Sequence, residues 1–197
     1  MKHLLKSLAR WLAVVAILPG YLSWWIRSRL LGPDVALEGS SELLSHLPGL
    51  TGCYLRAAFY SLVLRDSHPS ARICFGVLFS KSDSVIGENV YIGPRCNLGW
   101  VSIERDVLLA PGVQIPSGPH THGTADPTRP IREQPGRSQQ VRIGAGSWIG
   151  TNAVVMADVG VNCVVGAGAV VTRPLPDNVV AVGIPARIVQ HRASTPA

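Results

Sequence analysis

The amino-acid sequence predicts a mainly β protein, a solenoid of six-residue repeats that follows an apolar helical segment at the N-terminus. An aliphatic residue recurs every six positions from about Ile73 onward, and an uncharged run, WLAVVAILPGYLSWWI, occupies residues 11–26. The chain has 197 residues, of which 47% are hydrophobic and 15% charged. This composition excludes a disordered chain and suits one domain with an appendage.

The net charge of +6 is concentrated at the N-terminus. Five basic residues precede the first acidic residue, Asp34: Lys2, Lys6, Arg10, Arg27 and Arg29. Of the 18 Lys and Arg residues, 13 remain to oppose the 12 Asp and Glu residues, so the rest of the chain is nearly neutral. This distribution argues against nucleic acid as a partner and favours a basic membrane anchor.

Residues 1–31 are expected to form this anchor at the cytoplasmic face of a bacterial inner membrane, where the leaflet is anionic. The 16 residues of the apolar run would span about 24 Å as a helix, short of the roughly 30 Å hydrocarbon core. Pro19-Gly20 should kink or break that helix, and Trp24 and Trp25 are typical interface anchors. A re-entrant segment, a spanning helix and a signal peptide remain alternatives, although no small-residue cleavage site follows.

Residues 32–72 are expected to be a helical linker region. Apolar residues recur there at helical spacing and would form one stripe that packs on the body of the protein: Leu55, Ala58, Phe59, Leu62 and Val63. Thr51 is the expected N-cap of this helix, because Pro48-Gly49 interrupts the segment before it.

The six-residue period is the strongest pattern in the chain. Its aliphatic positions are Ile86, Ile92, Leu98, Ile103, Leu109, Ile115, Ile143, Ile149, Val155, Val159, Val165 and Val171. A period of six fits neither a helix nor an alternating strand. It fits a solenoid whose aliphatic residues point inward, while a following glycine or small polar residue forms a corner. The spacing falls to five after Leu98 and to four after Val155, which predicts shortened faces or bulged corners.

The solenoid is predicted to cover residues 73–190, with residues 191–197 as a tail. A polar insertion rich in Pro, Arg and Gln interrupts the repeat at residues 120–140. Insertions that project from a solenoid are preferred places for function.

The repeat resembles that of the hexapeptide-repeat acyltransferases, and IGAGSWIGTNAVV and VVGAGAVVTRPLPDNVVAVGIPARIV are the specific stretches. The pattern of its repeats resembles that of galactoside and maltose O-acetyltransferases and of acetyltransferases from exopolysaccharide gene clusters. The resemblance implies a left-handed parallel β-helix, a homotrimer, and acetyl-CoA as co-substrate with no metal. The N-terminal segment implies a branch that acts on a polysaccharide or lipid-linked saccharide.

Transfer of an acetyl group to a hydroxyl needs a base for the hydroxyl proton and donors for the oxyanion. Two histidines stand at the mouth of the insertion, in SGPHTHGT. His120 matches the catalytic histidine of the galactoside-type family and is the expected base, with His122 as the alternative. Asp126, Glu133 or a backbone carbonyl would orient it.

The resemblance also implies a CoA site. The positions that match the family are Trp148 in WIG, Thr151, Ala167 in GAGAV, Thr172, Arg173 and Arg187 in IPAR. Trp148 would line the CoA groove, and Thr151 and the Ala167 amide would lie near the pantetheine or thioester. Thr172 and Arg173 match the family's Thr-Lys pair near the CoA end, with Arg in place of Lys.

Arg187 would bind a CoA phosphate, as a guanidinium suits. One further basic position of the family is Gln190 here, so Arg192 is an alternative phosphate contact.

The acceptor site departs from the galactoside pattern because the stretch PRCNLGWVSIERD is shortened. Asn97 and Arg95 are candidate acceptor contacts, although Asn97 could instead be a corner residue inside the coil. Other hypotheses are a non-enzymatic membrane scaffold, transfer of another acyl group, and an amino-sugar acceptor. A zinc β-helix enzyme of the γ-carbonic-anhydrase type would need a third histidine within the repeat, which the sequence lacks.

Overall fold

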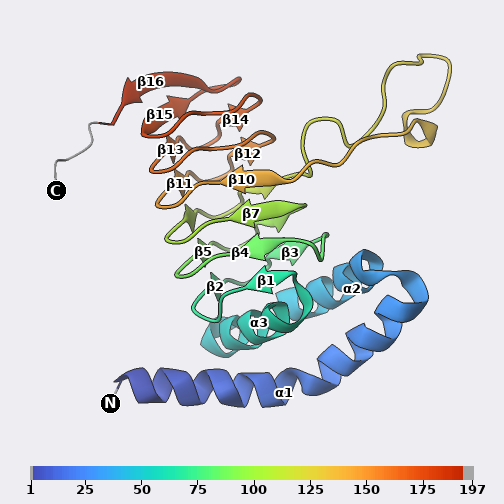
Figure 1. Ribbon diagram of the computed structural model, residues 1–197, viewed down its shortest axis with the longest axis vertical. Coiled ribbons are helices and arrows are strands. Elements are labelled where there is room, and N and C mark those ends of the chain that lie inside the picture. The colour runs from blue at the N-terminus through green and yellow to red at the C-terminus, as the bar shows by residue number, and fades with distance from the viewer. Residues whose placement is uncertain (1, 193–197) are drawn as a thin grey trace.

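The computed structural model describes residues 2–192 and consists of a helical cap followed by a long β-coil. The cap contains α1 (Lys2–Leu31), α2 (Pro33–Ser45) and α3 (Gly49–Val63). Figure 1 shows the three helices at one end of the coil, with α1 lying across that end. The described C-terminal residues lie at the opposite end.

The coil is a three-sided parallel β-helix, and each side is one sheet. Sheet A contains, in spatial order, β1 (Asp66–Ser67), β4 (Val85–Ile86), β7 (Val101–Ile103) and β10 (Val141–Ile143). Sheet B contains β2 (Arg72–Ile73), β5 (Tyr91–Ile92), β8 (Leu108–Leu109), β11 (Trp148–Ile149), β13 (Val164–Val165), β15 (Val179–Val182) and β16 (Arg187–His191). Sheet C contains β3 (Leu78–Phe79), β6 (Asn97–Leu98), β9 (Gln114–Ile115), β12 (Val154–Val155) and β14 (Val170–Val171).

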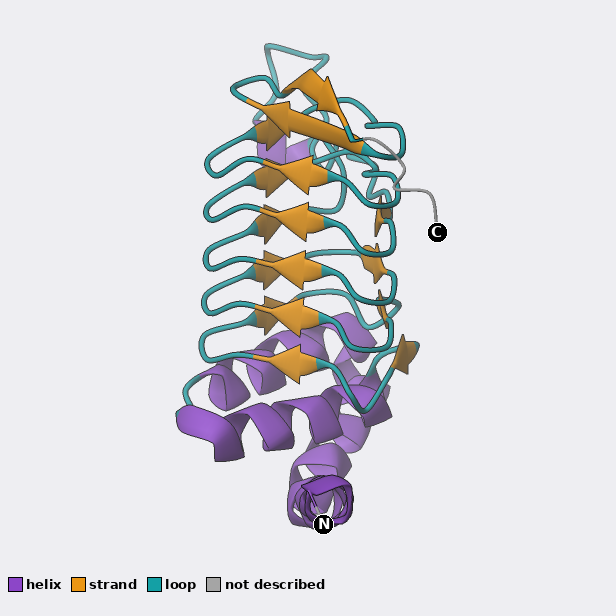
Figure 2. Ribbon diagram, turned by 90° about the vertical axis from the view of Figure 1, so that its left-hand side faces the viewer, coloured by secondary structure: helices purple, strands orange, loops and turns teal. Residues whose placement is uncertain are grey.

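The chain visits sheets A, B and C in turn, so each coil has an A–B, a B–C and a C–A corner. Figure 2 views sheet B face on, with its strands stacked above the helices. All ladders are parallel except the last, in which β16 returns antiparallel to β15 at the end of the coil.

The six-residue repeat fills the interior of the coil, as the sequence predicts. Each of the twelve repeat aliphatics is at most 1% exposed, because it occupies the inward position of its strand while its neighbour faces outward. The coil continues through both shortened spacings. After the second one, Val159 forms single bridges to Ile143 and Leu175 and so extends sheet A without a full strand.

The corners depend on residues that tolerate a left-handed backbone. Gly112 has φ of +75° at a B–C corner, where an added Cβ would collide with the Asn152 side chain. At the A–B corners, Asn89 and Asp106 also have positive φ, and the Asn89 amide donates to the Asp106 carboxylate at 2.8 Å. Asn and Asp are the residues besides glycine that visit this region most readily.

The predicted kink in α1 is present, but the helix does not break. α1 contains Pro19, and Figure 1 shows that the helix changes direction near its middle, as a missing N–H and a ring clash cause. Within it, the stretch Lys6–Leu31 is long enough to cross a membrane, and its most apolar window has a mean hydropathy of 1.3 and is only 11% buried.

Two predicted boundaries differ in the structure. α3 begins at Gly49 with Pro48 as its N-cap, so the prediction of Thr51 was wrong. The prolyl ring holds Pro48 in an extended conformation next to the first turn. The coil begins at β1 rather than at Ile73, because Asp66 and Ser67 already pair with Val85 and Ile86.

A buried arginine joins the cap to the first coil. Arg56 of α3 is 0% exposed, and its guanidinium donates to the carbonyls of Leu44 at 2.9 Å, Leu47 at 2.7 Å and Ile73 at 3.0 Å. Beside it, the hydroxyl groups of Tyr60 and Ser41 form a 2.8 Å hydrogen bond. The cap and the coil therefore share one core.

Candidate active site

The polar insertion leaves the coil at a C–A corner, between β9 and β10, and extends away from the coil (Figure 1). Two backbone hydrogen bonds hold the ends of the insertion together. The Gln139 N–H donates to the Ser117 carbonyl at 2.8 Å, and the Arg137 N–H donates to the His120 carbonyl at 2.7 Å. These paired segments, residues 117–122 and 136–139, are called the neck of the insertion. Further out, the buried Gln134 amide bonds the backbone of Asp126 and Arg129. The loop is therefore internally hydrogen-bonded, and His120 has a fixed backbone.

Both candidate histidines are exposed at this neck. Thr121, which separates them, lines an open pocket of ≈ 370 Å³ on the outer surface of sheet C. The other polar lining residues are Ser80, Asn97, Gln114 and Ser117. Neither His120 nor His122 is among the residues that line this pocket, but each is the direct sequence neighbour of Thr121, which does line it.

Asn97 faces this pocket and is not a corner residue. It occupies the outward position of β6 and is exposed, whereas Leu98 points into the coil. Arg95 instead stands at a B–C corner with φ of +61°, and it is not among the pocket's lining residues. Of the two candidate acceptor contacts, only Asn97 therefore lies next to the neck of the insertion.

The two acidic residues of the insertion have other partners. The Asp126 carboxylate accepts hydrogen bonds from the Thr128 hydroxyl at 2.6 Å and from the Thr128 N–H at 2.9 Å. These bonds lower the pKa of Asp126 from its ordinary 3.8. Glu133 lies 3.9 Å from Arg132. Within residues 2–192, neither carboxylate is hydrogen-bonded to a histidine ring.

Three of the predicted CoA contacts follow the B–C corner toward the far end of the coil. Thr151 and Ala167 stand at successive corners, linked by a 2.8 Å hydrogen bond from Gly168 N–H to the Thr151 carbonyl. Arg187 begins β16 of sheet B, and the Ala186 N–H just before it donates to the Val170 carbonyl of sheet C at 2.8 Å. Among the described residues, no partner bonds the Ala167 N–H, so this amide is available to a ligand.

The other predicted contacts lie elsewhere on the coil. Thr172 and Arg173 follow β14 at a C–A corner, the corner that also carries the insertion. Trp148 projects from sheet B and is 51% exposed. Arg192 donates to the Asn162 carbonyl at 2.6 Å. Within a single copy of the protein, the predicted CoA contacts therefore lie along both edges of sheet C, whereas Trp148 lies on the outer face of sheet B.

Sequence reasoning did not identify the polar floor of the pocket. Ser80, Gln114 and Ser117 line it together with Asn97. A signal existed: Asn97 and Gln114 each directly precede a buried repeat aliphatic and lie in register on neighbouring strands. An outward polar position that recurs on the same side of the coil marks a hydrophilic face. In the described part of the chain, no three His, Cys, Asp or Glu side chains converge.

The repeat matches a known family over residues 140–173, described as the hexapeptide repeat of succinyl-transferase. The chain is 28% identical over 170 residues to a galactoside O-acetyltransferase of Escherichia coli, covering 73% of this chain and 81% of that protein. It is also 32% identical over 124 residues to a putative lipopolysaccharide biosynthesis O-acetyl transferase of Escherichia coli. That match covers 58% of this chain and 61% of the relative.

The fold has a counterpart among solved structures. A maltose O-acetyltransferase from Clostridium difficile superposes with a TM-score of 0.69 at 23% identity, covering 82% of this chain and 89% of that protein. This likeness concerns the coil architecture. By its repeat and its sequence relatives, the chain resembles the hexapeptide-repeat acyltransferases, among them galactoside O-acetyltransferases.

Proposed function

We propose that this protein is an acyl-CoA-dependent acyltransferase that moves an acetyl group to a hydroxyl of a sugar, with His120 as the general base. The observation that carries the proposal is the polar pocket on sheet C, which Asn97 and Thr121 line at the neck of the insertion. The sequence relatives named as O-acetyltransferases support the reaction class.

The reaction needs few groups. As the acceptor oxygen attacks the thioester carbonyl, His120 takes the hydroxyl proton. The carbon–sulfur bond then breaks, the acetyl group stays on the sugar oxygen, and the proton passes to the CoA sulfur. His122 is the alternative base. Backbone or side-chain donors must stabilise the oxyanion that forms on the carbonyl.

The two edges of sheet C offer a path for acetyl-CoA. Thr151, the free Ala167 amide and Arg187 follow one edge, and Thr172 and Arg173 lie at the other. The amide would donate to the thioester or pantetheine, and the arginines would pair with phosphates. Along this path the thioester would approach the pocket from the far end of the coil.

Trp148 would complete the site from a second copy of the chain. It projects from sheet B, where Leu108 is also exposed and Tyr91 and Val164 are half-buried. An apolar outer face on a parallel sheet favours contact with another subunit. A homotrimer would place sheet B of one subunit beside sheet C of the next and close the CoA groove between them.

The acceptor is proposed to be a polysaccharide or lipid-linked saccharide at the cytoplasmic face of the membrane. α1 exposes Trp11, Leu12, Val15 and Leu22, and a basic segment with such a face suits an anionic bilayer surface. α1 also packs on α3 and on α2, where Arg27 donates to the Ala36 carbonyl at 3.2 Å and to the Ser40 hydroxyl at 2.7 Å. A helix held along the cap in this way is better placed to lie in the interface than to cross it.

The test is release of CoA thiol from acetyl-CoA by purified full-length protein, measured with a panel of free and lipid-linked saccharides. His120→Ala should lower acceptor-dependent turnover by a factor on the order of 10²–10⁴, the usual contribution of a general base. His68→Ala is the matched control, because His68 is an exposed histidine on the coil far from the insertion in sequence.

Circular dichroism should show the same fold in each variant, since both side chains are exposed. Full turnover in His120→Ala would overturn the assignment of the base. If His122→Ala alone were inactive, the two histidines would exchange roles. If wild-type protein released no CoA with any saccharide, the proposed reaction itself would be wrong.

A further inference from the structure

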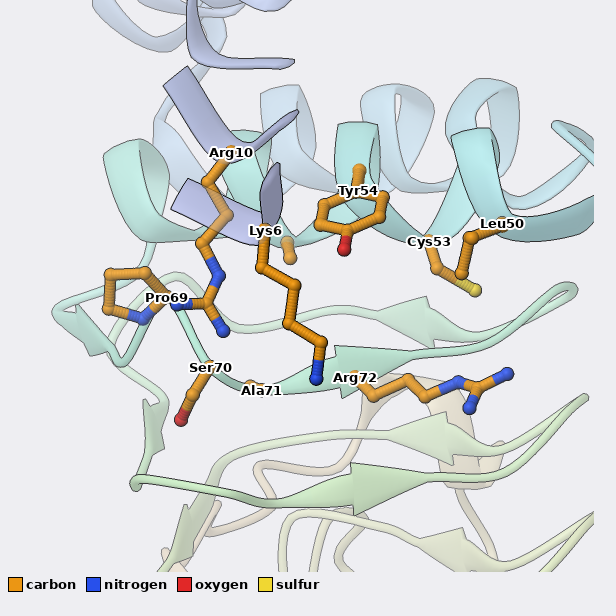
Figure 3. Close-up of a pocket in the computed structure, with 10 residues that line it drawn as sticks. Lys6, Arg10, Leu50, Cys53, Tyr54, Pro69, Ser70, Ala71 and Arg72 are labelled. Atoms are coloured by element: carbon orange, nitrogen blue, oxygen red, sulfur yellow. The ribbon is translucent and has the colours of Figure 1, made fainter. Parts of the chain in front are cut away.

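A second pocket lies on the side of the molecule where the helical cap meets the first coil. Figure 3 shows it between α1, α3 and the segment that leads into β2. Its volume is ≈ 200 Å³, below the roughly 300–1,000 Å³ of sites that hold whole drug-sized ligands. It therefore suits a small group such as a phosphate, not a nucleotide.

The pocket is strongly basic. Lys6 and Arg10, one helical turn apart on α1, reach toward the coil, and Arg72 of β2 lines the opposite side (Figure 3). No carboxylate lines the pocket. Among the described residues, none of these three cations forms an ion pair. Lys6 and Arg10 carry like charges one helical turn apart and repel each other, and a bound anion would relieve that repulsion. The Arg72 guanidinium extends away from these two groups (Figure 3).

Two further features prepare the pocket for an anion. The Arg72 guanidinium lies 5.7 Å from the centre of the Tyr91 ring, a cation–π contact that restricts its position. The Tyr54 hydroxyl points into the pocket from α3 (Figure 3) and can donate to an oxygen. The combined donors are an ammonium, two guanidinium groups and a phenol, a set that matches the oxygens of a phosphate.

An apolar groove continues from this pocket. It has a volume of ≈ 380 Å³ and runs between α1 and α3 along Ala9, Leu12, Ala13, Ala16, Leu50, Thr51, Tyr54 and Leu55. Leu50 and Tyr54 line both spaces, so the groove and the basic pocket adjoin. Small side chains on α1 leave room for an extended hydrocarbon chain. The charged and the apolar space together match an amphiphile with one anionic head.

We propose that these two spaces form one binding site for a membrane lipid, with its phosphate between Lys6, Arg10 and Arg72 and its hydrocarbon chain in the α1–α3 groove. The site rests on the proposed membrane association of α1. If α1 lies in the interface, a lipid phosphate is at the depth of the pocket, and the coil stands away from the bilayer. A bound lipid would then hold the cap in one orientation on the membrane.

The test uses full-length protein and sedimentation with vesicles of phosphatidylcholine, with or without phosphatidic acid. Arg72→Gln is the informative variant, since Arg72 is exposed and lies outside α1. It should weaken binding to phosphatidic acid vesicles about fivefold, as expected for about 1 kcal/mol per basic residue, and leave binding to phosphatidylcholine unchanged. Arg105→Gln, which removes another exposed coil charge, one that lies 3.8 Å from Asp106, should change neither.

Equal effects of Arg72→Gln and Arg105→Gln would overturn the site and leave only general electrostatic attraction. Competition by inorganic phosphate at a concentration similar to that of phosphatidic acid would also overturn the site. The hydrocarbon chain of the lipid would then contribute nothing to the affinity. Failure of wild-type protein to bind any vesicle would refute the membrane association as well. His120→Ala should keep the lipid preference, so loss of acyl transfer and loss of lipid binding are separate outcomes.

Discussion

Replacement of Arg56 by methionine should uncouple the helical cap from the coil. The substitution keeps an unbranched apolar side chain in a site that is 0% exposed, but it removes every donor. The carbonyls of Leu44, Leu47 and Ile73 would then lose their partner. An unsatisfied buried acceptor costs about 1–3 kcal/mol, while removal of a buried charge regains several kcal/mol of desolvation. The free energy that holds the cap on the coil should therefore fall by about 3 kcal/mol in total.

Hydrogen exchange followed by mass spectrometry measures this loss locally. A loss of about 3 kcal/mol corresponds to exchange on the order of 10²-fold faster in α2 and α3, with the coil beyond β4 unchanged. Arg65→Met is the matched control, because Arg65 forms an exposed ion pair with Asp83 at 3.3 Å and such pairs contribute about 0–1 kcal/mol. Equal exchange in both variants would refute the reasoning that Arg56 fastens the cap.

Three further outcomes are expected. Ile103→Ala should lower the free energy of unfolding in urea by about 2–5 kcal/mol, whereas Ser102→Ala, on the outward side of β7, should change it by less than about 0.5 kcal/mol. Gly136→Ala should lower acetyl transfer at an unchanged melting temperature of the coil, because a Cβ there would collide with the Thr121 carbonyl in the insertion neck; unchanged transfer would contradict this role. Burial raises the pKa of Asp34, but hydrogen bonds from Ser82 and Lys81 outweigh it and hold the pKa below 3.8. The stability that Asp34 contributes is therefore present above its unfolded pKa of about 3.9 and lost as pH falls through the lower folded value, so urea midpoints below about pH 4 should fall more steeply for wild type than for Asp34→Asn.

The coil could be predicted from the sequence because its rule is local. Each repeat needs one inward aliphatic residue and one tolerant corner, and both are visible within six residues. The inward positions, such as Leu109 and Ile149, are indeed fully buried. The start of the coil was not visible, because Asp66 and Ser67 join sheet A by backbone pairing and carry no aliphatic signal.

The contacts of the cap could not be predicted in the same way. Arg56 lies in a run of apolar residues, yet it is buried because carbonyls from α2, the α2–α3 connection and β2 converge on it. Burial also raises the pKa of Tyr60 to about 12, which keeps its hydroxyl protonated for the bond to Ser41. These partners are distant in the sequence, and no local pattern marks them.

The candidate site follows from how a solenoid separates its interior from its surface. Because the inward aliphatics and the backbone ladders alone define the coil, the outward positions of sheet C are free to be polar, and a corner can carry an insertion without disturbing the next strand. The bond between Gln139 and Ser117 closes the insertion where it leaves the coil, and β10 then pairs with β7 in unbroken register. The rigid coil therefore fixes the backbone of the neck that carries His120, the proposed base.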